Sequence, residues 1–276
     1  MNEHRRRQIL GVMRLELKKG LLGRRAIPIY VLGLIPVGMV TLSVIVSSIF
    51  GVDPEFQGTG GAYLAFIMLF YMLILPVTVY FGCVWIFLNL FRGEVIDRSL
   101  HYYFLTPIRR EVLAAGKYLS ALSISVVVFG GSTAVCFLVI FGYLGGSGAG
   151  AGAGIGISEI GLLLRYLAGV VVACLGYGAV FLVVGLFLRN FIVPALIIFL
   201  IEFMAHPFLP AALQKVSIVF YLYGIVPLPA ADGPFKILAE PVSPWIAIPG
   251  LILFTALTLF AASLRIRKME IAYGAD

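Results

Sequence analysis

Charged residues are scarce in this sequence of 276 residues, where Asp, Glu, Lys and Arg make up only 12%. Soluble globular proteins contain about 25% charged residues and about 45–50% apolar ones. Here the hydrophobic share is 61% and the mean hydropathy is +1.07. A compact soluble fold of this composition would lack the polar surface needed to cover its core. The composition therefore predicts an integral membrane protein, in which net charge +7 records orientation and not a nucleic-acid partner.

Signatures of catalysis and of bound cofactors are also missing. The three cysteines lie inside apolar runs, and their number and spacing fit neither a disulfide framework nor a metal cage: Cys83, Cys136 and Cys174. A phosphate-binding loop needs G-x-x-x-x-G-K-[ST], but Gly116-Lys117 is followed by Tyr118 and has Glu111 at the place of the first glycine. The chain is therefore expected not to be an enzyme and to bind no cofactor or metal of its own.

Long apolar runs, in contrast, are abundant. A helix needs about 20 mostly apolar residues to cross the hydrocarbon core of a bilayer, which is about 30 Å thick. Five runs reach this length: residues 27–50, 62–90, 119–144, 162–188 and 245–264. A sixth run, 191–205, is shorter and spans about 22 Å at about 1.5 Å per residue. The sequence thus predicts an all-α, polytopic membrane domain over residues 1–276, with six transmembrane helices.

Basic residues indicate how many runs cross. With six crossings, 17 of the 20 Lys and Arg residues lie on one side, and only Arg165, Lys215 and Lys236 lie on the other. The positive-inside rule then places both termini in the cytoplasm. A seventh crossing at 211–228 would carry the basic residues after the last span to the opposite side. The region 206–244 is therefore expected to be extracytoplasmic and re-entrant.

The segment before the first run, residues 1–26, combines basic residues with a periodic apolar stripe. The stripe recurs at spacings of three and four residues: Leu10, Met13, Leu17 and Leu21. This pattern favours an amphipathic helix that lies in the inner interface of the lipid bilayer. A disordered basic tail that only sets the topology is the alternative.

The connection between the second and third runs, residues 91–118, carries a further helix pattern. Thr106 can cap a helix whose first residue is Pro107, where a missing N–H is harmless. The expected apolar face consists of Ile108, Val112, Ala115 and Leu119. The pattern predicts a short helix parallel to the membrane that presents a charged face to a cytoplasmic partner, with a solvated turn as the alternative.

Several short motifs in this connection occur in a fixed order. They are Gly93-Glu94, Ser99-Leu100, Thr106-Pro107-Ile108-Arg109-Arg110 and Gly116-Lys117-Tyr118. As a set they resemble the cytoplasmic signature of ABC type-2 (ABC-2) transporter permeases. The resemblance also covers the basic N-terminal segment, the six-span layout and the re-entrant region.

This resemblance implies a function, partners and a location. The chain would be the permease subunit of an ABC transporter, an exporter in a bacterial-type cytoplasmic membrane. It would pair with a second permease copy, and ATP and Mg would be bound by a separate ABC ATPase. The residues implied in ATPase coupling are Glu94, Pro107, Ile108, Arg109, Arg110, Glu111, Gly116 and Lys117.

One carboxylate, Glu202, lies well within an apolar run, and His206 follows four residues later. Ionisable groups at membrane depth are costly and often functional, so the two could line an outer gate or a substrate path. The alternative is that Glu202 lies near the outer interface and pairs with His206. A secondary, ion-coupled transporter is the competing function, but such proteins usually contain several intramembrane carboxylates and an internal repeat.

Overall fold

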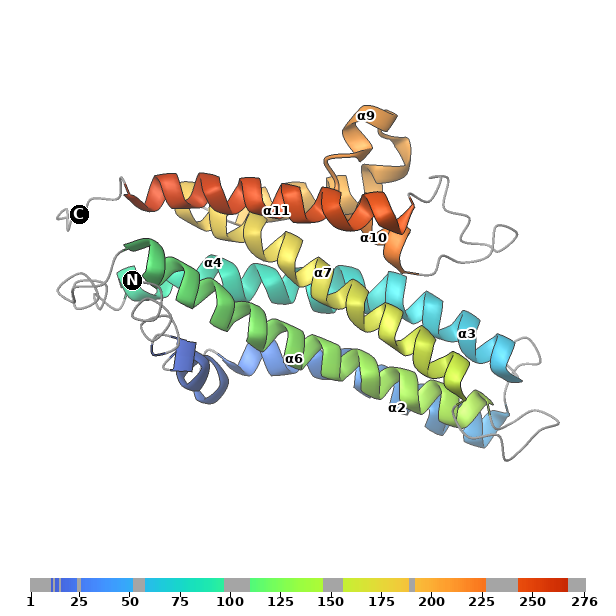
Figure 1. Ribbon diagram of the computed structural model, residues 1–276. Coiled ribbons are helices and arrows are strands. Elements are labelled where there is room, and N and C mark those ends of the chain that lie inside the picture. Colours follow the sequence, from blue (N-terminus) through green and yellow to red (C-terminus); the bar gives the residue numbers. More distant parts are fainter. Residues whose placement is uncertain are drawn as a thin grey trace.

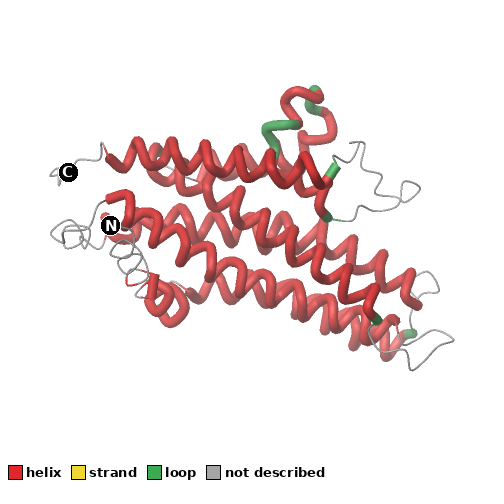
Figure 2. The backbone as a smooth tube through the Cα atoms, in the orientation of Figure 1, coloured by secondary structure: helices red, strands yellow, loops and turns green. Residues whose placement is uncertain are grey.

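The computed structural model describes most of the chain. The described residues are 11, 13–14, 16–23, 26–51, 58–96, 110–145, 156–188, 192–226 and 243–267. Within these ranges the regular structure is entirely helical, and the helices form an elongated bundle (Figures 1 and 2). The prediction of an all-α protein with several membrane helices is confirmed to this extent.

Five helical stretches are long and apolar enough to cross a membrane. They are Ile27–Phe50, Gly58–Leu90, Leu113–Leu144, Ile157–Phe187 and Pro244–Arg265. In Figure 1 the first is α2 (Ile27–Phe50), and the second is built from α3 (Gly58–Leu69), η3 (Phe70–Tyr80) and the start of α4 (Phe81–Ile96). The others belong to α6 (Arg110–Leu144), α7 (Ile157–Phe187) and α11 (Pro244–Arg267).

The sixth predicted span is a shorter apolar helix, Ile192–Ala205. It consists of α8 (Ile192–Phe199) and the π-helical η5 (Leu200–Ala205). Three short helices follow: η6 (His206–Phe208), α9 (Ala211–Gln214) and α10 (Ile218–Ile225). Because α10 rises only about 12 Å at about 1.5 Å per residue, it cannot cross a bilayer by itself.

Helix α7 lies at the centre of the bundle, where it contacts α4, α6, α10 and α11. The core around it is unusually aromatic, and Tyr80, Tyr177 and Phe181 are fully buried there. The Tyr80 ring meets those of Tyr177 and Phe181 edge-on at 5.1 Å. The close approach of α7 to α4 depends on a glycine, since a Cβ on Gly178 would lie 2.5 Å from the ring of Phe87.

The second long stretch changes its hydrogen-bonding pattern over the π-helical η3, Phe70–Tyr80, which contains Pro76. Proline has no N–H, so the regular α pattern cannot continue through it. Such π segments are rare and occur often at functional positions. Within the described chain there are two, η3 and η5, and the Tyr80 ring of η3 meets the Phe203 ring of η5 with 5.5 Å between centroids. The Tyr80 hydroxyl also donates to the carbonyl of Ala195 in α8 at 2.6 Å.

The prediction of a separate helix over 107–117 is wrong for the part that the structure describes. Helix α6 runs without a break from Arg110 to Leu144, so residues 110–117 extend the third span. The sequence contains no proline between these bounds, and Ala114 and Ala115 favour helix continuation. The end of the connection between the second and third long stretches is therefore joined to the bundle by one 35-residue helix.

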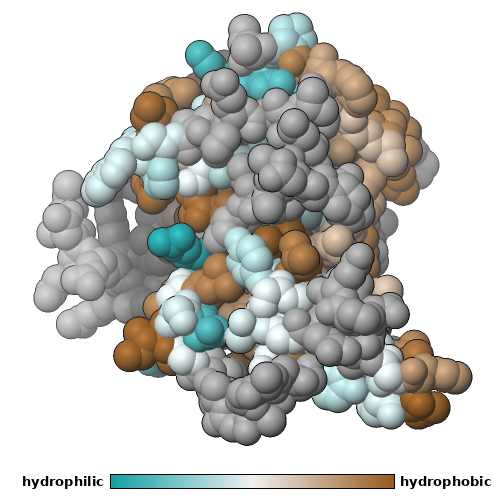
Figure 3. All heavy atoms as spheres, turned by 90° about the vertical axis from the view of Figure 1, so that its right-hand side faces the viewer, coloured by the Kyte–Doolittle hydropathy of each residue, from teal (hydrophilic) through white to brown (hydrophobic). Residues whose placement is uncertain are grey.

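The helix ends fall into two groups, one at each end of the bundle. The end of α4, the start of α6 and the ends of α7 and α11 lie together with the N-terminal helical residues 16–22 (Figure 1, left). Arg265 of α11 stacks over the Phe187 ring of α7 at 5.2 Å, which ties two of these ends together. Viewed onto the opposite end, the described surface mixes hydrophilic and hydrophobic residues, with hydrophobic ones gathered toward the rim (Figure 3).

Candidate functional site

The N-terminal helical segment docks onto the first turns of α6 through a buried ion pair. Lys117 is 0% exposed, and its Nζ lies 3.0 Å from Oε1 of Glu16. Leu17 and Leu21 pack against the core beside this pair, while Arg14 and Lys18 are exposed. The segment is therefore amphipathic, as the pattern predicts, but its apolar residues Leu17 and Leu21 lie on the bundle and its basic face is turned away from it.

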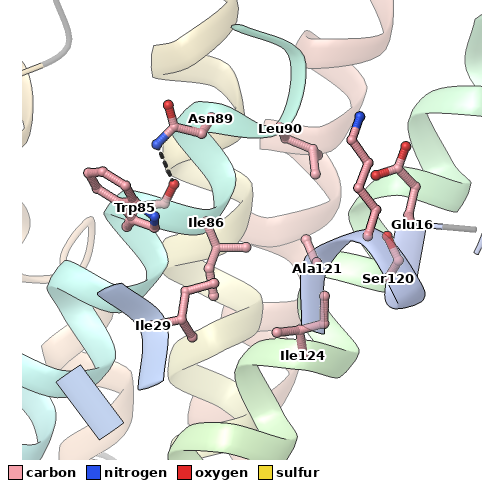
Figure 4. A pocket seen from close by; sticks show the side chains of 11 residues that line it. Glu16, Ile29, Trp85, Ile86, Asn89, Leu90, Ser120, Ala121 and Ile124 are labelled. Carbon is pink, nitrogen blue, oxygen red and sulfur yellow. Dashed lines mark hydrogen bonds between the residues drawn. The ribbon is translucent and has the colours of Figure 1, made fainter. Parts of the chain in front are cut away.

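A small pocket of about 100 Å³ lies next to the ion pair, between the N-terminal segment, α2, α4 and α6. Figure 4 shows Glu16 and Ser120 on one side of this pocket and Trp85 and Asn89 on the other. The amide of Asn89 donates to the carbonyl of Trp85 at 2.8 Å. Polar and apolar groups of the N-terminal segment and both flanking helices thus meet at this end of the bundle.

The other predicted coupling residues are only partly described. Glu94 lies in the last turn of α4, and Arg110 and Glu111 open α6, but their side chains are not described. Pro107, Ile108 and Arg109 lie outside the described residues. Gly116 is buried in α6 next to Lys117. Of this set, Lys117 alone has both its position and its side-chain partner in the described part of the structure.

The predicted apolar face of the coupling segment is wrong where the structure describes it. Ala115 and Leu119 are exposed, whereas Leu113, Lys117 and Ser120 are buried. A buried lysine is uncommon because a charged group normally stays in water. Here a long-range carboxylate, 101 residues away in the sequence, receives the lysine, and helical periodicity alone gives no sign of it.

At the other site, Glu202 projects from η5 into a set of four hydrogen-bond donors. The backbone N–H of Ile218 donates to Oε1 at 3.1 Å, and that of Val219 donates to Oε2 at 3.1 Å. The Ser217 hydroxyl donates to Oε2 at 2.9 Å, and the Tyr177 hydroxyl approaches the same oxygen at 3.4 Å. The side chain is 7% exposed, so this carboxylate is buried but well supplied with partners.

These bonds make Glu202 the cap of α10. The first N–H groups of a helix have no partner within the helix, and a carboxylate there is favoured by the positive end of the helix dipole. Ser217 occupies the N-cap position, but its hydroxyl binds Glu202 in place of the backbone. Glu202 does not pair with His206 in the structure, which was the alternative expectation. The hydrogen-bond partners of Glu202 lie in α7 and at the start of α10.

His206 begins η6 and is 1% exposed, and its ring meets that of Tyr223 edge-on at 5.6 Å. Neither ring nitrogen has a hydrogen-bond partner within the described part of the chain. Burial lowers the pKa of His206 below its ordinary value because the charged ring would lose its hydration. The two predicted residues thus lie in consecutive short helices, η5 and η6, and in different surroundings.

A cavity of about 380 Å³ lies beside Glu202, between α7, the α8–η5 helix, α10 and α11. Its walls are mainly apolar and include Val180, Ile198 and Phe254. Glu202 and Ser217 supply the polar groups of the lining. Ligand sites are commonly concave, mostly apolar and provided with a few oriented polar groups, and this cavity meets that description.

Sequence reasoning found Glu202 but missed the residues that hold it. The signal for one of them is local, because Ser217 directly precedes the apolar run of α10 and serine is a favoured N-cap residue. Tyr177 and Glu16 carry no such signal, since each meets its partner only through tertiary packing. Compared with known proteins, the chain matches no described family and no curated protein.

Proposed function

We propose that the chain is the membrane-spanning permease subunit of an ATP-driven ABC transporter, and that it works as an exporter. ATP and Mg would be bound by a separate ATPase subunit, and a second permease copy would complete the translocation path. The basis is the ordered set of motifs from Gly93-Glu94 to Gly116-Lys117 that resembles the ABC-2 permease signature.

The observation that carries the proposal is how this set of motifs connects to the bundle. Glu94 lies near the end of α4 and Lys117 near the start of α6, and both helices continue into the packed core. A push on the connection between them would be transmitted along α6 as a rigid lever. The buried pair of Lys117 with Glu16 would carry the same movement to the N-terminal segment.

A six-crossing topology with both termini in the cytoplasm is part of the proposal. The described ends that adjoin basic connections gather at one end of the bundle, which fits the positive-inside rule (Figure 1). The short helix Ile192–Ala205 would then be the fifth crossing, through a locally thinned bilayer. The helices α9 and α10 would form the re-entrant region, since broken helices at membrane depth survive where they are packed in protein.

Co-purification from native membranes tests the proposal directly. The tagged chain is expected to bring down a polypeptide with a phosphate-binding loop. Replacing Arg109 and Arg110 together by alanine should lower its yield several-fold. Arg165→Ala removes a cation from α7, outside the connection that carries the motifs, and serves as the matched control. If no such ATPase accompanies the wild-type chain, the permease proposal fails.

A secondary transporter remains the second candidate because one observation favours it: Glu202 is a buried carboxylate in an apolar helix. Such a group can exchange a proton or bind a cation during transport. Liposomes that contain the purified chain alone separate the two functions. Uptake or release driven by a proton gradient, without any ATPase, would favour the secondary transporter.

A further inference from the structure

The cavity beside Glu202 combines an apolar interior with exposed aliphatic residues in its lining. Val180, Ile198 and Phe254 form part of its inner wall, while Leu213 and Val216 are 54% and 61% exposed at its margin. The exposed residues are aliphatic, so they suit contact with lipid chains and not with water. A molecule dissolved in the bilayer could therefore enter this cavity sideways.

The polar groups of the lining lie together, so the cavity has one polar end. There Glu202 receives bonds from two backbone N–H groups and two hydroxyls, none of which carries a full positive charge. Within the described part of the chain no ion pair neutralises this carboxylate. A buried charge is costly unless it is paired, so the site lacks the counter-charge that would stabilise it most.

The carboxylate also retains acceptor capacity. Each oxygen of an ionised carboxylate can accept about two hydrogen bonds. Oε2 of Glu202 already receives the bonds of Ser217 and Val219 and the longer one of Tyr177, whereas Oε1 receives a single bond, from Ile218. An additional donor in the cavity can therefore bind Oε1 without displacing the cap of α10. A ligand carboxylate at the same place would meet like charge.

We propose that this cavity binds a single-chain cationic amphiphile, with its ammonium group at Glu202 and its alkyl chain along the apolar wall. A volume of about 380 Å³ lies within the range of small-molecule sites, which is about 300–1,000 Å³. This inference rests on the proposed function in one respect: it names the class of molecule that the permease would carry. Binding itself requires neither ATP nor the partner ATPase.

Photolabelling of the full chain in phosphatidylcholine nanodiscs tests the inference. The probe is a ten-carbon primary amine with a diazirine at the end of its alkyl chain, and labelled positions are mapped by peptide mass spectrometry. Labels are expected on residues 209–218 and 248–260, which supply parts of the wall. Decylamine should compete about tenfold better than decanol, a difference of about 1.4 kcal/mol, and decanoate should compete least.

Two variants separate the head-group site from the wall. Glu202→Gln should remove the preference for decylamine over decanol, while Glu159→Gln, a carboxylate outside this cavity, should keep it. Val216→Trp fills the margin of the cavity at an exposed position and should lower labelling by every probe. If Glu202→Gln does not fold, the inference is still tested by the order in which decylamine, decanol and decanoate compete and by the labelling of Val216→Trp.

Some outcomes would overturn the inference. Equal competition by decanol or decanoate would show that the carboxylate does not select a cation, and unchanged labelling of Val216→Trp would place the probe elsewhere. The permease proposal fails separately, through the absence of an accompanying ATPase. If the chain binds the amine but no ATPase accompanies it, the inference about the cavity holds and the permease proposal fails.

Discussion

Glu16 and Lys117 form a buried ion pair across 101 residues of sequence, with 3.0 Å between Oε1 and Nζ. The two partners are not equivalent, since the lysine side chain is 0% exposed and the glutamate side chain is 12% exposed. A charge in a fully dry environment costs more than one with some access to solvent. The pair therefore joins the N-terminal segment to α6 through an ammonium group that depends on its carboxylate.

This asymmetry predicts which substitution is more harmful. Glu16→Gln removes the carboxylate charge that faces a dry ammonium, and should destabilise the protein by about 3–5 kcal/mol. Lys117→Met keeps a long apolar stem and leaves a carboxylate that solvent can reach, so its cost should be less than about 2 kcal/mol. Thermal unfolding of the purified variants in detergent measures the order.

The charge-reversed double variant provides the control for this pair. Glu16→Lys combined with Lys117→Glu should recover part of the stability that each single reversal loses, because the attraction is restored. A coupling free energy near zero in this double-mutant cycle would contradict the ion pair as a stabilising contact. Glu159→Gln changes a partly exposed carboxylate in the first turn of α7 and should lower the unfolding temperature less than Glu16→Gln does.

Close packing between α4 and α6 predicts a second effect. A Cβ placed on Gly82 would overlap the ring of Phe129, which is fully buried. Gly82→Ala should therefore destabilise the bundle by about 1–3 kcal/mol through overpacking, although alanine is the better helix former. Gly131→Ala is the matched control, since nothing lies within 4 Å of its added Cβ. Recovery of stability in Gly82→Ala with Phe129→Leu would confirm the contact.

The helices of this protein could be predicted largely from composition. The first span is expected at residues 27–50 and occurs as Ile27–Phe50 because an uninterrupted apolar run is itself the requirement for crossing. The stretches predicted at 62–90 and 162–188 begin earlier in the structure, at Gly58 and Ile157. Their first turns contain glycine or polar residues. A hydropathy criterion leaves such residues out of a predicted span, although they can form the first turn of a helix.

The contacts between helices could not be predicted in the same way. Hydropathy and periodicity describe one helix at a time, whereas the partners of Lys117 and Glu202 come from distant segments. The burial of Lys117 is an exception to the rule that charges avoid burial, and this exception depends on a partner from another segment, Glu16. Glu202 was singled out by its cost in an apolar helix, but the donors of α10 that offset this cost required the tertiary structure.

Removing the Glu202 cap should loosen α10 more than the rest of the bundle. Glu202→Ala deletes the acceptor of the Ile218 and Val219 N–H groups, and hydrogen bonds to charged groups contribute about 1.5–3 kcal/mol each. Hydrogen exchange should become at least tenfold faster at these two amides and remain unchanged in the middle of α6. Ser217→Ala removes one hydroxyl bond and should have a smaller effect. Equal protection in Glu202→Ala and the wild type would contradict the capping role.

The buried ring of His206 predicts a dependence of stability on pH. Its pKa in the folded protein lies below the ordinary value of about 6.5, so the unfolded chain binds the proton more readily. The free energy of unfolding should then fall as pH drops below about 6.5, and the contribution should be fully present above that value. His206→Phe keeps an aromatic ring against Tyr223 and removes the titrating nitrogens. Unfolding temperatures at pH 7.5 and pH 5.5 should differ less in this variant than in the wild type. Because Glu202 is present in both proteins, the difference between the two pH slopes isolates the histidine, and identical slopes would refute its assignment as a buried neutral ring.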